Sequence, residues 1–290
     1  MNFVSYAQNF EDVILWRSLA DVPNGFYIDV GAQHPVYDSV SKAFYEHGWR
    51  GVHVEATATY AALLREDRPD ELVLQVALNH ESGSIPFYEI PDTGLSTGDE
   101  SIADHHRAQN YSVIKTEVLC ITLADVFSQV GSRDIHWLKI DVEGMEQHVL
   151  TGWGEHPHRP WILVIESTYP NSQIETHERW EYFLMKRGYK FAYFDGLSRY
   201  YLYASKLNML KNFLTPPNIF DGFSLAASVP CNGQILNFMQ EKEQQYKSTI
   251  IELKSHHIKD LKAEQDKFRL FKNSLQSKLQ LLVNEIPDGS

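Results

Sequence analysis

Apolar and amphipathic segments alternate between residues 26 and 203, which is the pattern of a sheet covered by helices. The clearest apolar segment is Phe26–Val30, which contains a single acid and is followed by Gly31. Strands that helices cover on both faces lose the alternation of apolar and polar side chains, so this segment is predicted to be a buried parallel strand. Further strands of this kind are predicted over 51–55, 72–78, 136–141 and 161–165.

Amphipathic segments with capping residues at their ends predict helices between these strands. They are expected over or around 13–16, 38–48, 60–64, 122–131, 149–150 and 180–187. Two aromatic segments follow, 189–194 and 199–203, and Asp195-Gly196 between them indicates a hairpin. The predicted fold is therefore α/β: a doubly wound, Rossmann-like sheet with an antiparallel C-terminal hairpin.

Residues 91–116 interrupt this rhythm with a loop-like run and with the polar run Asp104-His105-His106-Arg107. Long irregular inserts in compact domains are usually functional or disordered. We expect a loop that faces the substrate, and the alternative is a solvated excursion on the surface. His105 or His106 would then be a general base near neutral pH, because histidine titrates in that range.

The C-terminal segment 235–283 contains no Pro or Gly and consists of Lys, Glu, Gln and spaced apolar residues. Apolar residues recur there every seven positions, at Leu261, Phe268, Leu275 and Leu282. This repeat predicts a long coiled-coil helix, with a single amphipathic helix packed on the domain as the alternative. The predicted organisation is a globular domain over 1–225, a linker over 226–234 and an oligomerisation helix over 235–286, which would form a dimer or trimer.

Composition narrows the class of protein. Of 290 residues, 43% are hydrophobic and 12% aromatic, as in globular proteins. The formal net charge of −12 argues against nucleic acid as the main partner. Cys120 and Cys231 have no CxxC spacing, so neither a zinc site nor a disulfide framework is expected. Neither a signal peptide nor a membrane-spanning run is recognisable, and we expect a protein of the cytoplasm or of the inner face of the membrane.

The turn after the first strand is suited to a ligand, because glycine allows a close approach to the backbone. Gly31 ends that strand, and Glu55 ends the next one about 20 residues later, the spacing at which an acid binds the hydroxyls of a ribose. We therefore expect a cofactor of the nucleoside type at this edge of the sheet. The alternative is an ordinary α/β domain with a charged loop after its second strand.

Two later predicted strands also end in carboxylates, which would lie at the same edge of the sheet. Asp141 ends one strand and Glu166 ends the next. Such a pair can remove a proton from a hydroxyl or, alternatively, hold a hard cation such as Mg²⁺. Glu143 is a third candidate ligand, although an acid in the first turn of a helix is favourable in any case.

Several segments in the same order resemble the FkbM-type methyltransferase family. They are Tyr6–Asp12, Ile28–Ala32, Gly48–Glu55, Leu138–Gly144 and Asp195–Tyr201. The resemblance covers residues 1–225 and implies a class I fold that transfers a methyl group from S-adenosylmethionine to a hydroxyl, commonly on a sugar or a secondary metabolite. It implies cofactor contacts from Gln8, Asp29, Gly31, Ala32, Glu55, Ala77 and Asn79.

The sequence departs from the family at two places on the rim of the cofactor site. Gln33-His34-Pro35 stands where the family has Asn-x-Gly, and Ala56 stands where the family has Pro. Both departures bear on the cofactor contacts more than on the fold.

Taken together, these features predict an S-adenosylmethionine-dependent O-methyltransferase that acts on a glycan or glycolipid, as in cell-surface polysaccharide biosynthesis. Methylation of a small secondary metabolite is one alternative. A catalytically inactive scaffold that binds the cofactor and assembles through the C-terminal helix is another. A nicotinamide-dependent dehydrogenase is disfavoured, because the sequence lacks the GxGxxG that would seat a pyrophosphate.

Overall fold

The computed structural model describes residues 3–229 and 233–284, with the side chains of the last helix described over 241–277. The chain divides into two compact units, residues 1–232 and residues 233–290. The strands are β1 (Phe3–Ser5), β2 (Phe26–Val30), β3 (Arg50–Val54), β4 (Leu72–Leu74), β5 (Ala77–Leu78), β6 (Gly83–Glu89), β7 (Ile114–Ile121), β8 (Trp137–Ile140), β9 (Ile162–Glu166), β10 (Tyr189–Phe194), β11 (Ser198–Tyr203) and β12 (Phe223–Leu225).

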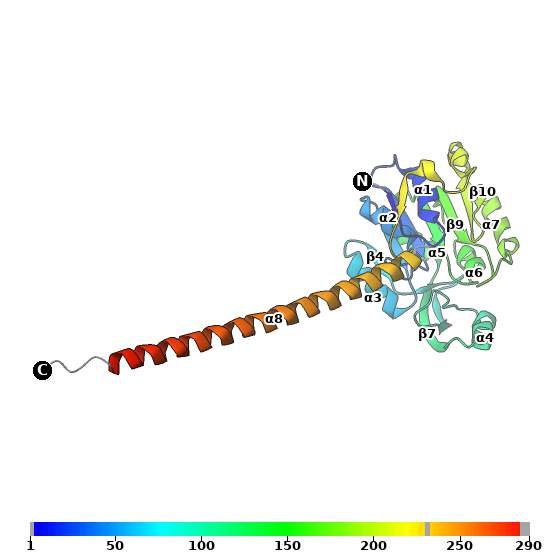
Figure 1. The fold of residues 1–290 in the computed structure, drawn as a ribbon. Coiled ribbons are helices and arrows are strands. Elements are labelled where there is room, and N and C mark those ends of the chain that lie inside the picture. Colours follow the sequence, from blue (N-terminus) through cyan, green and yellow to red (C-terminus); the bar gives the residue numbers. More distant parts are fainter. Residues whose placement is uncertain (1–2, 230–232, 285–290) are drawn as a thin grey trace. The chain divides into compact units, whose positions relative to one another are not determined.

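Helices connect most of these strands (Figure 1). The α-helices are α1 (Glu11–Leu19), α2 (Val40–Glu46), α3 (Ala58–Asp67), α4 (Glu100–Ala108), α5 (Leu123–Val130), α6 (Glu146–Thr151), α7 (Glu181–Lys186) and α8 (Gly233–Asn284). Short 3₁₀-helices are η1 (His177–Arg179), η2 (Ala204–Phe213) and η3 (Ile219–Asp221).

The large sheet of the first unit has seven strands in the order β10-β11-β9-β8-β2-β3-β4. Strands β4, β3, β2, β8 and β9 run parallel, whereas β11 is antiparallel to both β9 and β10. From β2 the chain proceeds outward through β3 and β4, and then returns to β8 on the other side of β2. The strand order therefore reverses between β2 and β8, the place where open α/β sheets bind their ligands.

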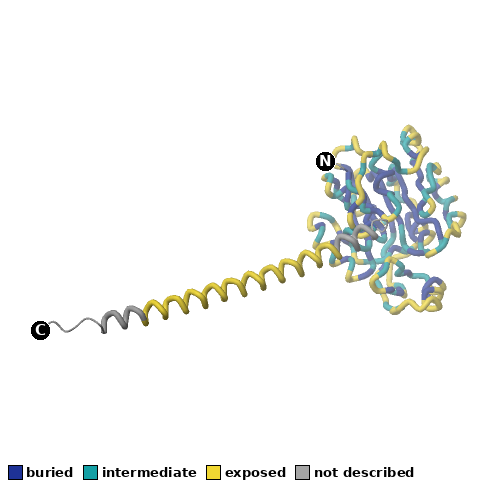
Figure 2. Tube along the Cα trace, viewed as in Figure 1, coloured by how far each residue is buried: buried dark blue, intermediate teal, exposed yellow. Residues whose placement is uncertain are grey.

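Helices cover both faces of this sheet. On one face, α5, α6 and α7 pack in a single buried cluster with strand residues such as Ile28 and Leu138. On the other face, α1, α2 and η2 cover Tyr27 and Trp137, whose rings stack with their centroids 4.6 Å apart. The central strands are accordingly among the most deeply buried parts of the unit (Figure 2). The prediction of a mixed α/β fold is confirmed.

The insert differs from the irregular loop that the sequence suggests. Strands β6 and β7 pair as an antiparallel hairpin, and β5 adds to β7 to give a three-stranded sheet. Between β6 and β7 lies α4, which begins because the Asp99 side chain accepts hydrogen bonds from the backbone N–H groups of Ser101 and Ile102. The predicted strand 72–78 is likewise wrong as one element, since its first half belongs to the large sheet and its second half to the small one.

The first unit also extends beyond the predicted boundary at residue 225. Strand β12 pairs in parallel with β1, and the Ala226 N–H donates to the Ser5 carbonyl at 2.8 Å. Val229 is fully buried. The first residues of the expected linker are therefore part of the domain, because they complete a small sheet with the N-terminal strand. Cys231 lies outside the described residues, whereas Cys120 is a buried free thiol in β7.

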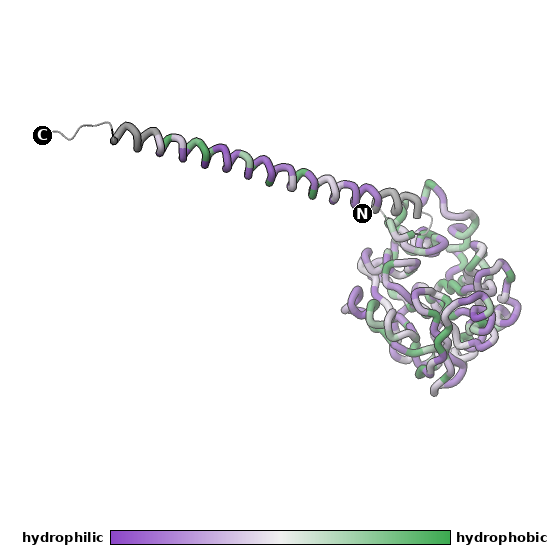
Figure 3. The backbone as a smooth tube through the Cα atoms, turned by 60° about the horizontal axis from the view of Figure 1, so that its bottom comes forward, coloured by the Kyte–Doolittle hydropathy of each residue, from purple (hydrophilic) through white to green (hydrophobic). Residues whose placement is uncertain are grey.

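Helix α8 is one continuous helix of 52 residues, so the expected long C-terminal helix is confirmed. Hydrophobic positions are spaced along it among hydrophilic ones (Figure 3). Leu261, Phe268 and Leu275 are 45%, 70% and 49% exposed. Leu282 lies outside the part of the helix whose side chains are described. No helix among the described residues is both long and apolar enough to cross a bilayer.

A buried ionic network fixes the loop that follows β2. Arg68, fully buried at the end of α3, donates to the Pro35 carbonyl at 2.7 Å and to Ser41 Oγ at 2.8 Å. Its Nε lies 3.9 Å from the fully buried Glu71 carboxylate, which also binds Tyr27 and His53 at 2.7 Å each. One guanidinium thus neutralises a buried acid and anchors loop 33–39.

We expect Arg68→Met to lower the free energy of unfolding by about 3–5 kcal/mol, because it leaves the Glu71 carboxylate buried without its cation. Urea denaturation followed by circular dichroism measures this loss. The matched control is Arg65→Met, which removes an exposed guanidinium from the same helix and should change stability by only about 0.5 kcal/mol. Equal unfolding midpoints for the two variants would contradict the assigned role.

Candidate functional site

A cavity of about 500 Å³ opens at the carboxyl ends of β2, β3, β8 and β9. Its walls come from these strand ends and the segments that follow them, from Gln8 and Glu11 around the start of α1, from β5 and β6, and from Leu197 in the β10–β11 turn. The insert contributes the loop 93–98, whereas α4 contributes none of the lining. The cavity therefore lies at the reversal of strand order, where the sequence predicts a ligand.

Gly31 allows two strand ends to come together at the floor of this cavity. Its φ is +75°, and a Cβ there would lie 1.7 Å from the Asp141 carbonyl oxygen. Its N–H donates to the Val54 carbonyl at 2.9 Å, and the Asp141 N–H donates to the Val30 carbonyl at 3.0 Å. Only glycine fits this position, because any side chain would separate the ends of β2 and β8.

Glu55 lies in the cavity wall at the end of β3, and it also supports the turns around it. Its Oε1 accepts from the N–H and hydroxyl of Thr57 at 2.8 and 2.7 Å, while its Oε2 accepts from the Gln33 N–H at 2.8 Å. Burial raises the pKa of this carboxyl. Since a carboxylate oxygen accepts two hydrogen bonds, Oε2 retains capacity for one ligand hydroxyl.

Most of the other residues predicted to contact a cofactor also line the cavity. They are Gln8, Asp29, Ala32 and Ala77. Asn79 does not line it, because its N–H donates to the Ile121 carbonyl and its side-chain oxygen accepts from the His80 N–H. Asn79 thus belongs to the edge of the small sheet rather than to the cavity.

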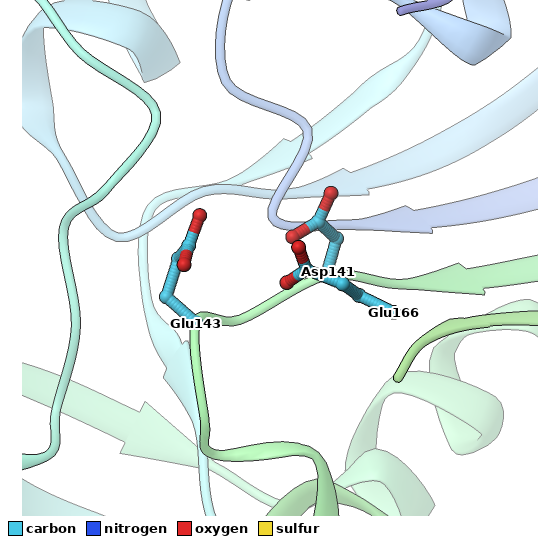
Figure 4. A group of neighbouring side chains, drawn as sticks. All are labelled: Asp141, Glu143 and Glu166. Atoms are coloured by element: carbon cyan, nitrogen blue, oxygen red, sulfur yellow. The ribbon is translucent and has the colours of Figure 1, made fainter. Parts of the chain in front are cut away.

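Three carboxylates of the cavity lining lie close together (Figure 4). Asp141, Glu143 and Glu166 each offer an oxygen within 4.8 Å of the others. Glu143 has a φ of +51°, and its carbonyl accepts from Thr97 Oγ1 of the insert at 2.7 Å. Its Oε2 is buried and has no hydrogen-bond partner among the described residues. An unpaired buried oxygen of this kind is costly unless a ligand satisfies it.

Lys139 controls the charge of this acidic cluster. It lies two residues before Asp141, so both side chains leave the same face of the strand, and its Nζ donates to Asp141 Oδ2 at 2.5 Å. Burial alone raises the pKa of Asp141, but the Lys139 charge and hydrogen bonds from Glu166 and Lys139 outweigh it and hold that pKa below its ordinary value. Burial and repulsion from Asp141 raise the pKa of Glu143 and Glu166 well above the ordinary value.

The cluster therefore combines one carboxylate that favours its ionised form with two carboxyls that favour protonation. Sequence reasoning named the acids but missed Lys139. Its signal was present, since a charged residue two positions before a strand-end acid must share that acid's face.

Glu11, an acid of the cavity lining, is another residue that the sequence analysis did not single out. Burial, followed by repulsion from Asp195, raises the pKa of Glu11 to about 8. Its Oε2 accepts from the Asn9 N–H at 2.9 Å, and the Asn9 side chain donates to the Asp195 carbonyl at 3.2 Å. The polar cluster before α1 is thus tied to the β10–β11 turn, with Gln8 placed in the cavity wall between them.

The two histidines of the insert are not brought to the cavity. His106 is fully buried in α4 with its ring against Tyr111, and His105 faces Tyr169 with ring centroids 5.6 Å apart. Both residues lie in the helix Glu100–Ala108, and neither lines the site. The expectation of a histidine base in a loop that faces the substrate is not met, because this part of the insert is a capped helix that contributes none of the lining.

The first unit thus combines a doubly wound sheet, a glycine turn, a carboxylate after the second strand and a cluster of carboxylates in one cavity, an arrangement typical of α/β enzymes that bind nucleoside-type cofactors. The chain belongs to the FkbM methyltransferase family, since the model of the methyltransferase FkbM domain matches residues 29–191. The resemblance found in the sequence is thereby confirmed, and the protein is a methyltransferase.

Comparison with solved structures finds an O-methyltransferase from Bacillus cereus, determined in complex with SAH. It is 11% identical, the alignment covers 69% of this chain and 80% of that one, and the TM-score is 0.34. This similarity is too low to support an argument about the site. No curated protein matches the sequence.

Proposed function

We propose that this protein uses S-adenosylmethionine to methylate a hydroxyl group of a glycan or glycolipid. The observation that carries the proposal is that Asp141, paired with Lys139, lines the same cavity as the glycine turn and Glu55. The residues that bind the cofactor and the residue that accepts the proton would then lie in the same cavity. We further propose that the enzyme works in cell-surface polysaccharide biosynthesis, in the cytoplasm or at the inner face of the membrane.

The residues of the cavity suit S-adenosylmethionine. Glu55 Oε2 has capacity for one ribose hydroxyl, and the Gly31 backbone lines the cavity, where it would meet the amino-acid end of the cofactor. Gln8, Asp29 and Ala77 would complete the contacts. When bound, the cofactor supplies a methyl group on a positively charged sulfur. The acidic lining favours such a cation electrostatically.

Asp141 would act on the acceptor hydroxyl. The bound cofactor would supply the methyl group that the acceptor oxygen takes, and the electron pair of the broken carbon–sulfur bond would stay on sulfur. The hydroxyl proton must leave, and the ionised Asp141 carboxylate is placed to accept it. Lys139 keeps this carboxylate ionised before the acceptor binds, and Glu166 donates a hydrogen bond to it.

A divalent cation held by Asp141, Glu143 and Glu166 is the alternative way to activate the hydroxyl. The unpartnered Oε2 of Glu143 supports this version, and an all-oxygen ligand set suits Mg²⁺. Lys139 occupies Asp141 Oδ2, which leaves the other oxygen of that carboxylate for a cation. Bound there, the cation would lower the pKa of the acceptor hydroxyl.

We expect Glu55→Ala to weaken S-adenosylmethionine binding by about 1–3 kcal/mol, the loss of hydrogen bonds to a charged group. Isothermal titration calorimetry measures it, and circular dichroism verifies that the variant is folded. Glu66→Ala, which removes an exposed acid from α3, is the control and should bind as the wild type does. Absence of S-adenosylmethionine binding to the wild type would refute the proposed cofactor.

We expect Asp141→Asn to lower turnover by about 10²-fold or more while cofactor binding persists, because the amide cannot accept the proton. Transfer of radiolabelled methyl to a panel of glycan acceptors measures turnover. Asp134→Asn is the control, because Asp134 is exposed and precedes the start of β8, at the end of the strand away from Asp141. If chelator abolishes wild-type activity and Mg²⁺ restores it, Asp141 is a metal ligand. If chelator has no effect, Asp141 is a general base.

Near-normal turnover in Asp141→Asn would exclude both roles for this residue.

The C-terminal helix supports an oligomer, which we propose to be a parallel dimer or trimer. Leu261, Phe268 and Leu275 form an exposed stripe on α8. Exposed apolar surface costs about 25 cal/mol per Å², so association along this stripe is favourable. Lys262, Lys267 and Lys272 would flank the seam, as charged residues do in coiled coils.

Multi-angle light scattering should give a dimer or trimer mass for the full chain and a monomer mass for a version ending at Asn232, which retains β12 and Val229. Phe268→Glu in the full chain should dissociate the oligomer, because it places a charge in the seam. Ala263→Glu should not, because Ala263 lies about half a turn around the helix from Leu261, on the face opposite the stripe. A monomeric full chain would disprove the proposed assembly.

A further inference from the structure

A groove of about 670 Å³ opens beside the cofactor cavity. Its three main walls are the loop after β2, the first turns of α3 and the end of β6 with the loop that follows it, and Ser228 after β12 also lines it. Residues of all three walls, such as Asp38, Tyr60 and Thr93, line the cavity as well. The groove is therefore a lateral extension of the catalytic space, and nothing in the proposed mechanism uses it.

The aromatic ring of Tyr37 lies at the edge of this groove, and we call it the aromatic platform. Tyr37 is 55% exposed, which is unusual for a residue of a tightly held loop. The N–H groups of Val36 and Tyr37 both donate to His34 Nδ1 at 3.0 Å, and the His34 and Tyr37 ring centroids are 4.4 Å apart. The tyrosine ring is thus held in place by its neighbour while a large part of its surface remains open to a ligand.

The polar residues that line the groove determine which ligand charge it can bind. Glu89 and Asp92 lie along it, and Asp38 has a buried Oδ1 without a hydrogen-bond partner among the described residues. No lysine or arginine is among the described residues that line it. Burial lowers the pKa of His34, and its Nδ1 already accepts two hydrogen bonds, so this ring is neutral. The groove repels anions and offers acceptors to hydroxyl groups.

We infer that this groove binds a neutral sugar unit of the acceptor, next to the unit that is methylated. One face of a pyranose ring presents C–H groups, which pack on the face of an aromatic ring such as Tyr37, while its hydroxyls donate to carboxylates. The inference rests on the proposed function and narrows the acceptor to a glycan that is uncharged at this unit. It also explains the departure from the family pattern, because Gln33-His34-Pro35 builds the loop that carries the platform.

The loop is anchored from both sides, which makes it a pre-formed binding surface. The Pro35 carbonyl accepts from the buried Arg68, and the Gln33 N–H donates to Glu55. A rigid platform loses little conformational entropy when a ligand binds, so weak carbohydrate contacts suffice for recognition.

Saturation-transfer NMR on the full chain tests this inference. The probes are the methyl glycosides of glucose, galactose and mannose, and the corresponding uronic acids. Neutral glycosides should receive saturation from the wild type and from Tyr37→Phe, which keeps the ring. Tyr37→Ala should weaken their binding by about fivefold or more, the usual effect of removing an aromatic anchor. Tyr182→Ala, which removes a tyrosine that is 65% exposed on α7, should have no effect.

The inference is overturned if no neutral glycoside receives saturation, if Tyr37→Ala binds them undiminished, or if the uronic acids bind as well as the neutral sugars. Calorimetry with S-adenosylmethionine separates this result from the proposed function. The cofactor should bind Tyr37→Ala and the wild type equally. Sugar binding without cofactor binding would remove the proposed function and leave the groove as a sugar site, whereas cofactor binding without sugar binding would remove only the groove.

Discussion

The contact between two strand ends is the constraint on which the rest of the site depends. A single missing side chain, at Gly31, lets the end of β2 lie against the Asp141 carbonyl at the end of β8. These strands lie on either side of the reversal in strand order, so their contact closes the floor of the cavity. It brings the turn proposed to face the cofactor and the carboxylate proposed to face the acceptor into one cavity.

Charge is the second organising factor. Lys139 is a buried cation surrounded by acids from three elements, with Asp141 and Asp29 on neighbouring strands and Glu11 on α1. Burial by itself lowers the pKa of Lys139, but these acids raise it above its ordinary value, so the residue stays charged. The ammonium in turn keeps Asp141 ionised, while Glu143 and Glu166 are left to favour their protonated forms. An acidic cavity can therefore present one defined proton acceptor rather than a set of equivalent ones.

The candidate site was predictable where it depends on the ends of strands. Glu55, Asp141 and Glu166 each follow an apolar run, and the carboxyl ends of parallel strands meet at one edge, so their proximity follows from the strand pattern alone. The insert was not predictable in this way. Gly, Pro and Ser suggested a loop over 91–116, yet Asp99 caps a helix there, and β7 finds its partners β5 and β6 only through pairing across the insert. His105 and His106 were lost as candidates for that reason, since helix formation decides which way a side chain faces.

The sequence by itself determined the alternation of strands and helices, the glycine at the first turn, the acids at the strand ends and the long C-terminal helix. These depend on local periodicity and on backbone conformations that accept few residue types, such as the positive φ of Gly31. Only the tertiary structure decided that Lys139 pairs with Asp141, that Arg68 anchors the loop after β2, and that Tyr37 stands exposed beside the cavity. The physical reason is that charge pairing, burial and exposure depend on which distant segments become neighbours, and a local pattern carries no information about that.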